Sequence, residues 1–267
     1  MVAATIGQVL ALAMRANAAL RGREPGPDWR DADAFRFCRS VRFAVARGGT
    51  PEIAARDPDH WLGRLAGAGA SGVKARIVST DAAEESIATG LIGGGSLWLI
   101  ETVLARGASR WWRADWRMEG RGSAEDPWAV TYWRVDPPES PVAERPIAAI
   151  AGALRRTLAE IADCAAECAP RFEESFRDAA AVLDGEKRVA PLDALAPVAL
   201  LAPEAERLFE ACRTAWAFGG AGAWSDGGFP DERAGEGGRL GARLFALLQE
   251  GLAAAANSTF PAPAERG

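Results

Sequence analysis

The side chains that most often carry chemistry are scarce in this chain, which has one histidine and one tyrosine among 267 residues. A single imidazole excludes metal sites built from several histidines, and it leaves one candidate base for a Ser-His-Asp or Cys-His relay. That histidine, His60, stands beside Asp57 and Asp59 in the first turn of a predicted helix. Because no second member of a relay can be identified, we expect His60 to be structural or exposed. Whether the chain catalyses any reaction stays open.

The cysteines are the other candidate ligands of a metal: Cys38, Cys164, Cys168 and Cys212. None of them forms a Cys-X-X-Cys pair. Cys164 and Cys168 stand one helical turn apart, a spacing that could present two thiolates to one metal, but a closed site would need the other two to converge there. Because most of the four fall on predicted apolar stripes, we expect reduced, buried thiols, with no bound metal and no cofactor.

A glycine-rich segment, residues 218–229, is the most unusual stretch of the sequence. Glycines let a backbone approach a ligand closely, and Trp224 could stack on such a ligand. Ser225 and Asp226 could form hydrogen bonds with it. The alternative is a flexible connection between two helices, in which Trp224 and Phe229 hold the loop on the core. We favour this second interpretation, since glycine density by itself marks loops more often than sites.

A tryptophan-rich segment, about residues 109–135, predicts a β-hairpin. Side chains alternate with a period of two along 111–118, a polar turn follows, and 128–135 is rich in aromatic and β-branched residues. One apolar face should be buried on helices. The other face is expected to carry aromatic and charged side chains: Trp111, Trp128, Tyr132, Arg113, Asp115 and Arg117. Tryptophan, tyrosine and arginine are enriched at binding hot spots, so this face is a candidate protein-binding surface; a surface sheet with cation–π contacts is the alternative.

A row of arginines could bind phosphate or the carboxylates of a partner: Arg36, Arg39, Arg42 and Arg47. The spacing of three places most of the row on one side of a predicted helix that begins at Asp31 or Asp33 and ends before Gly48. The opposite side carries an apolar stripe that includes Phe37. A solvated helix face is the more common interpretation of such a row.

Helical periodicity predicts further helices over 5–21, 81–91, 96–104, 147–168 and about 239–256, with others beginning at Pro58, Pro170 and Pro203, and a strand over 74–79. These elements indicate a mainly helical α+β protein. A small antiparallel Trp-rich hairpin or sheet would lie in the N-terminal half and a helical bundle in the C-terminal half. We expect an α+β domain over 1–136, a Pro-rich linker at 137–146, a helical domain over 147–256 and a frayed tail at 257–267.

The composition is that of a globular protein, with 49% hydrophobic and 25% charged residues, and it excludes a disordered chain, a collagen and a disulfide scaffold. The net charge of −5 does not favour general nucleic-acid binding, although residues 1–50 carry a basic excess. The uncharged stretch at 86–100 is too short and too rich in glycine to span a membrane. Residues 2–14 are uncharged as well, but Arg15 follows them and no basic residue precedes them, the reverse of a signal peptide.

These observations favour a non-catalytic interaction or accessory protein of the cytoplasm. It would bind an unidentified protein partner through the outer face of the hairpin, with the 218–229 loop as a second contact. The alternative is a small-ligand-binding protein, or an enzyme that works without histidine, in which arginine, aspartate and serine act around residues 224–226. We expect neither a nucleic-acid nor a membrane partner, and the sequence does not determine the oligomeric state.

Overall fold

The computed structural model describes residues 4–78, 96–119, 127–139, 141–188, 200–219, 223–224 and 231–261, in which all strands precede the helix that begins at Ile147 and the remaining elements are helices. The strands are β1 (Cys38–Arg47), β2 (Thr50–Ala55), β3 (Ala70–Val78), β4 (Leu97–Leu104), β5 (Arg110–Met118) and β6 (Trp128–Val135). The α-helices are α1 (Ala4–Leu20), α2 (Pro58–Leu65), α4 (Ile147–Cys168), α5 (Glu173–Asp184), α6 (Pro203–Thr214) and α7 (Asp231–Asn257). Short 3-10 helices lie at Trp29–Asp31, Asp33–Phe35 and Pro170–Phe172. The fold is therefore mixed α/β.

One sheet contains all six described strands, in the order β2-β1-β6-β5-β4-β3. β1 and β6 are parallel, and every other neighbouring pair is antiparallel. The predicted hairpin is confirmed as β5 and β6, but it forms the middle of the sheet. The expected small antiparallel sheet is therefore wrong in size and in type, because two segments that predict helices are strands.

The first of these segments is β1, and a bulge accounts for the error. Cys38 pairs with Trp128 and Ser40 pairs with Ala129, so one extra residue of β1 lies between the two pairs. Cys38 and Val41 consequently face the same side of the sheet although they are three residues apart. Apolar residues three apart are also typical of a helix, so this spacing accounts for the incorrect prediction of a helix in this segment.

The second segment is β4, whose apolar run shows no alternation because the strand is buried on both faces. Leu99 and Ile100 point to opposite sides of the sheet, and they are 2% and 0% exposed. A continuous apolar run of this length does not distinguish a buried strand from a buried helix. The helix predicted over 81–91 lies outside the described residues.

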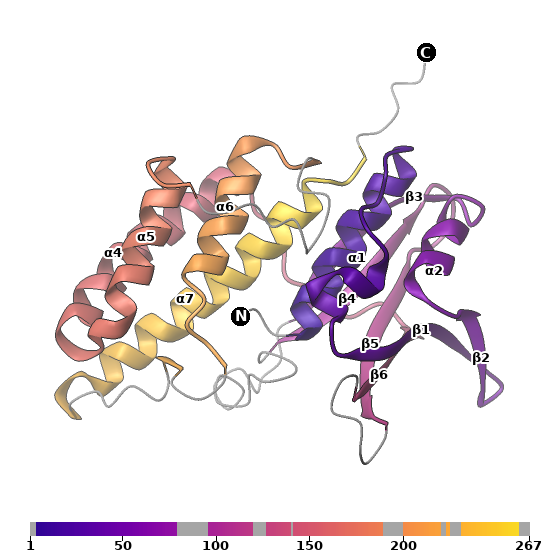
Figure 1. The fold of residues 1–267 in the computed structure, drawn as a ribbon, viewed down its shortest axis with the longest axis horizontal. Helices are drawn as coiled ribbons and strands as arrows, with labels where there is room; N and C mark the ends of the chain where they lie inside the picture. Colours follow the sequence, from indigo (N-terminus) through magenta and orange to yellow (C-terminus); the bar gives the residue numbers. More distant parts are fainter. Residues whose placement is uncertain are drawn as a thin grey trace.

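α1 is the central helix of the fold, which explains why this part of the chain is almost without charge. It contacts β3 and β4 as well as α7, and it lies between the sheet and the C-terminal helices (Figure 1). Every residue from Thr5 to Ala18 is buried, as expected of a helix that is apolar on all sides. The predicted helix at 5–21 is confirmed. Its one charged side chain, Arg15, is paired with Asp59 of α2 at 3.3 Å.

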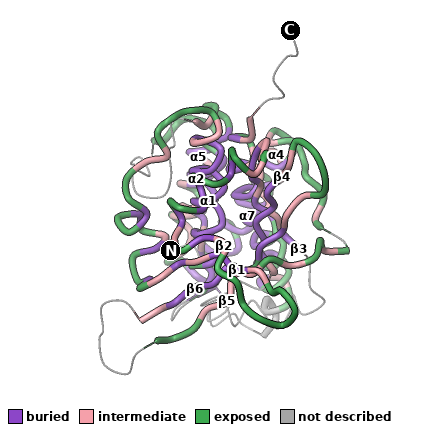
Figure 2. The backbone as a smooth tube through the Cα atoms, turned by 90° about the vertical axis from the view of Figure 1, so that its right-hand side faces the viewer, coloured by how far each residue is buried: buried purple, intermediate pink, exposed green. Residues whose placement is uncertain are grey.

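The C-terminal helices pack on one another and join the same core. α4 and α6 each contact both α5 and α7. Their buried side chains form one continuous cluster with those of α1 and the sheet, which Figure 2 shows as buried backbone through the centre of the molecule. The helices predicted at 147–168, after Pro170 and after Pro203 are confirmed. The division into two domains stays a prediction. None of the described helices combines the length and apolar composition that a membrane crossing requires.

β3 forms one edge of the sheet, and side chains from both halves of the chain cap its backbone. Asn17 of α1 accepts a hydrogen bond from the N–H of Val73 (2.8 Å) and donates one to the carbonyl of the same residue (2.9 Å). Asn257, at the end of α7, makes the same pair of bonds with Ala75, at 2.8 and 3.0 Å. Two amide side chains thus stand where a further strand would pair, which protects this edge.

Candidate functional site

The register of the hairpin decides which aromatic side chains reach the outer face of the sheet, the face turned away from α1. Arg113 of β5 lies opposite Trp133 of β6, and Ala114 lies opposite Tyr132. Paired residues share a face, so Trp133 joins four residues of β5 on the outer face: Trp111, Arg113, Asp115 and Arg117. Trp128 and Tyr132 belong to the inner face. The prediction that these two share a face with Arg113 is therefore wrong.

Tyr132 is a core residue that helps to hold α1 on the sheet. Its side chain is fully buried, and its ring stacks on that of Phe43 with 5.1 Å between centroids. Its hydroxyl donates to Oε1 of Gln8 at 3.1 Å, and Nε2 of Gln8 donates in turn to Sγ of Cys38 at 3.1 Å. Burial, with a smaller contribution from Cys38, raises the pKa of Tyr132 well above its ordinary value. A partner at the surface cannot reach this side chain.

Alkaline titration tests this placement, because the chain contains one tyrosine. An unfolded chain loses the tyrosine proton at about pH 10, whereas burial keeps Tyr132 protonated in the folded protein. The stability from this difference is complete below about pH 10 and is lost as the pH rises above it, by up to about 1.4 kcal/mol per unit. We expect tyrosinate absorbance to appear together with the loss of circular dichroism. Tyrosinate that forms at about pH 10 in a protein with native circular dichroism would contradict the placement; Tyr132→Phe supplies the background.

The outer face holds a small apolar strip that is separate from the main core. Trp111 and Leu99 are 8% and 2% exposed, yet neither belongs to the continuous cluster on the other side of the sheet. Glu101 lies opposite Trp111 and Arg76 lies opposite Leu99, and these two charged side chains pair at 2.6 Å. Among the predicted binding residues, Trp111 therefore offers little surface, while Arg113 is exposed.

Several aromatic and apolar residues lie at the end of the sheet where β1 and β6 begin and β5 ends. Met118 pairs with Trp128, and the N–H of Trp128 donates to the carbonyl of Phe37 at 3.2 Å. The ring of Trp128 meets that of Trp116 edge-on at 5.9 Å. Phe37 and Met118 are 54% and 69% exposed. We call Phe37, Trp116, Met118 and Trp128 the strand-end patch.

Sequence reasoning missed the strand-end patch because it assigned both of its exposed members to buried faces. Phe37 counts in the apolar stripe of a helix that does not exist. Met118 does lie on the inner face, but at its end, where most of the side chain is exposed. To predict that these residues lie together, one must know where β1 and β6 begin and where β5 ends. The sequence does not indicate where β1 begins.

The glycine-rich loop is described at Trp224, whereas Ser225 and Asp226 lie outside the described residues. Trp224 is 2% exposed, and its indole N–H donates to the carbonyl of Gly237 at 3.0 Å. Its ring meets that of Phe176 at 5.5 Å. Trp224 is thus packed between α5 and α7 and attaches the loop to the core. A role of the loop in ligand binding stays a prediction.

His60 and the cysteines lie in separate places. His60 is exposed; its N–H donates to Oδ1 of Asp57 at 2.7 Å, and its Nδ1 accepts from the N–H of Arg56 at 3.3 Å. The predicted helix start at Pro58 is confirmed. All four cysteines are free thiols, and burial raises the pKa of the Cys212 thiol. Within the described ranges, no group of three or more histidine, cysteine and carboxylate side chains is placed to hold a metal.

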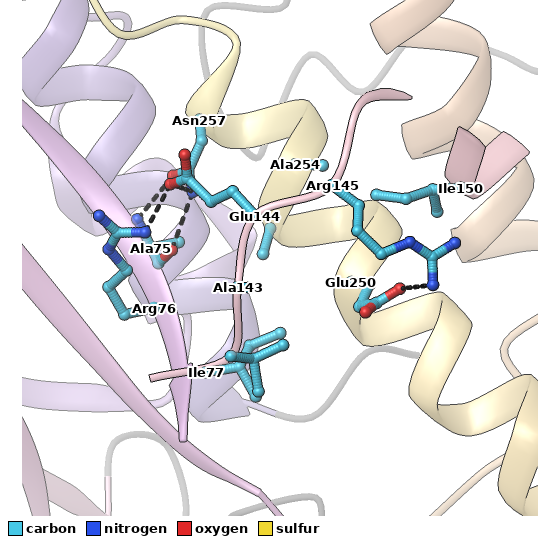
Figure 3. Close-up of a pocket in the computed structure, with 12 residues that line it drawn as sticks. Ala75, Arg76, Ile77, Ala143, Glu144, Arg145, Ile150, Glu250, Ala254 and Asn257 are labelled. Atoms are coloured by element: carbon cyan, nitrogen blue, oxygen red, sulfur yellow. Dashed lines mark hydrogen bonds and ion pairs between the residues drawn. The ribbon is translucent and has the colours of Figure 1, made fainter. Parts of the chain in front are cut away.

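Ion pairs join both the β3 edge and α7 to Glu144 and Arg145, which lie between β6 and α4 (Figure 3). Glu144, between β6 and α4, accepts hydrogen bonds from three side chains: Lys74 (3.0 Å), Arg76 (2.6 Å) and Asn257 (3.2 Å). Arg145 pairs with Glu250 of α7 at 3.0 Å. The cavity among these residues measures about 30 Å³, which suits two or three water molecules at roughly 10–15 Å³ each. Its charges pair with one another, so we assign this junction a structural role.

An open groove of about 250 Å³ lies between α4 and α7. Its lining includes Cys164, Arg239 and four carboxylates: Glu160, Asp163, Glu167 and Glu236. Glu160 pairs with Arg243 at 2.8 Å, and Asp163 pairs with Arg177 at 3.4 Å. These ion pairs satisfy part of the acidic lining from the protein itself.

The structure thus separates the residues that the sequence predicted for the hairpin surface and for the second contact at the 218–229 loop. Trp111 and Arg113 stay together on the outer face, Trp128 lies in the strand-end patch, and Tyr132 and Trp224 are buried in the core. No protein-family model matches the chain, and neither the curated proteins nor the solved structures contain a match to it, so the function is argued from this geometry.

Proposed function

We propose that this protein is a non-catalytic interaction or accessory protein of the cytoplasm. Its protein partner binds at the strand-end patch and also contacts the outer face of the sheet around Arg113. The observation that carries the proposal is the exposure of Phe37 and Met118 on either side of Trp128. Single exposed apolar residues are common on protein surfaces, whereas aromatic and apolar side chains that gather at one place mark interaction sites.

The contacts of His60 and of the charged side chains around Glu144 support a binding role over a catalytic one. His60 takes part in contacts at the start of a helix, and the charges around Glu144 are used to join the two halves of the chain. The small-ligand alternative depends on Ser225 and Asp226, which lie outside the described residues. No observation among the described residues favours that alternative.

Photo-crosslinking in cells of the source organism tests the proposed function. A photoreactive phenylalanine analogue replaces Met118 or Arg113, and a third variant carries it at Arg207, which is exposed on α6. We expect irradiation to produce a discrete species of higher mass from the variants at 118 and 113, and none from the variant at 207. No product at 118, or equal products at all three positions, would overturn the proposal.

A further inference from the structure

We infer that the strand-end patch binds an acidic protein segment that carries apolar side chains. This inference rests on the proposed function and adds the chemistry of the partner. Its basis is the combination, at one end of the sheet, of exposed apolar side chains with arginines that form no ion pair with any of the described residues.

Three exposed arginines lie next to the patch along the chain: Arg36 and Arg39 on either side of Phe37, and Arg117 beside Met118 but on the outer face. The guanidinium of Arg36 lies over the ring of Phe37, 5.7 Å from its centroid, and Arg117 pairs with Asp115 at 3.1 Å. Arg36 and Arg39 are exposed, and neither forms an ion pair with any residue in the described ranges. Two guanidinium groups are therefore available to carboxylates of a partner, which they can bind through paired hydrogen bonds.

The bulge in β1 separates these two arginines from the rest of the predicted arginine row. Arg42, three residues further along, lies on the outer face and donates to Oγ1 of Thr131 at 3.0 Å. Arg36 and Arg39 remain at the start of β1, beside Phe37. The row therefore does not form one long basic stripe such as a phosphate backbone would need, but a short basic border to an apolar surface.

The neighbours of the arginines favour a protein segment over other anions. Free phosphate would make no use of Phe37 and Met118. A single-stranded nucleic acid would need a longer basic track than Arg36, Arg39 and Arg117 provide. A segment with both apolar side chains and carboxylates fits the apolar patch and its basic border together.

Fluorescence anisotropy with the full chain and a labelled peptide of alternating leucine and glutamate tests this inference. We expect saturable binding that weakens as salt is added. The double variant Phe37→Ser with Met118→Ser should weaken binding by about tenfold or more, and so should Arg36→Gln with Arg39→Gln. Two matched controls should leave binding unchanged. Ile53→Ser changes another exposed apolar residue (48% exposed), and Arg106→Gln changes an exposed arginine that precedes β5, at the opposite end of the strand from Met118.

Other occupants of the patch give different results with the same variants. Equal binding of a leucine–lysine peptide would overturn the inference, and so would binding of a single-stranded oligonucleotide or of phospholipid vesicles that Phe37→Ser abolishes. Self-association of the chain that the same variant abolishes would overturn it too. If no acidic peptide binds while cross-links at 118 persist, the inference fails and the proposed function stands. If the cross-links are also absent, the proposed function fails as well.

Discussion

Replacing Asn17 with alanine is expected to lower the free energy of unfolding by about 3 kcal/mol or more, since each buried polar group left unpaired costs roughly 1–3 kcal/mol. Asn17 is fully buried in α1. Its amide holds the N–H and the carbonyl of Val73 at 2.8 and 2.9 Å, and it donates to Oγ1 of Thr259 at 3.0 Å. Asn17→Ala removes these bonds and leaves two backbone groups of the β3 edge without a partner. Denaturation by urea measures the loss.

Asn257→Ala is the matched comparison. Asn257 makes the same pair of bonds with Ala75, at 2.8 and 3.0 Å, but from a half-buried position. Water can take over part of its role, so the expected loss is smaller, about 1 kcal/mol. If Asn17→Ala lowers the free energy of unfolding no more than Asn257→Ala does, the buried hydrogen bonds of Asn17 to Val73 do not contribute the additional stability that we predict.

Asn17 also shows how far the sequence can lead. Asparagine is a poor residue for the interior of a helix, so its presence in an apolar helix signals a polar partner. The partner lies 56 residues away along the chain, and no local pattern identifies it. The helix at 147–168 and the two strands of the hairpin are predicted correctly for the opposite reason, because a local period of 3.6 or 2 is enough to define each of them.

The errors arise where contacts between distant segments decide the outcome. The bulge in β1 and the burial of both faces of β4 remove the alternation that marks a strand. The register of β5 against β6 turns Tyr132 toward α1 and not toward the surface. The strand-end patch follows from the parallel pairing of β1 with β6, which brings Phe37 beside Trp128, and neither strand alone indicates that pairing.

Replacing Trp224 with alanine is expected to cost about 3–5 kcal/mol, the usual effect of removing a large aromatic side chain from a core. Trp224 is 2% exposed, packs on Phe176 and donates to the carbonyl of Gly237. At roughly 2–4 °C per kcal/mol for a chain of this size, the thermal midpoint should fall by about 10 °C. If Trp224 were instead exposed at the surface as a ligand contact, its replacement with alanine would lower the free energy of unfolding by about 0.5 kcal/mol or less. A thermal melt of Trp224→Ala therefore distinguishes the two interpretations of the glycine-rich loop.

Two glycines of α7 provide an independent control that leaves Trp224 in place. A Cβ atom at Gly241 would lie 2.7 Å from Cδ1 and Nε1 of Trp224, whereas a Cβ at Gly238 would meet nothing within 4 Å. Gly238→Ala should therefore stabilise the protein by up to about 1 kcal/mol, the gain in helix propensity. Gly241→Ala should lose that gain and more, because the indole must move out of a packed site. If both variants stabilise the protein equally, the indole does not occupy the site against α7, and Trp224 becomes available for the ligand-binding role that its burial now argues against.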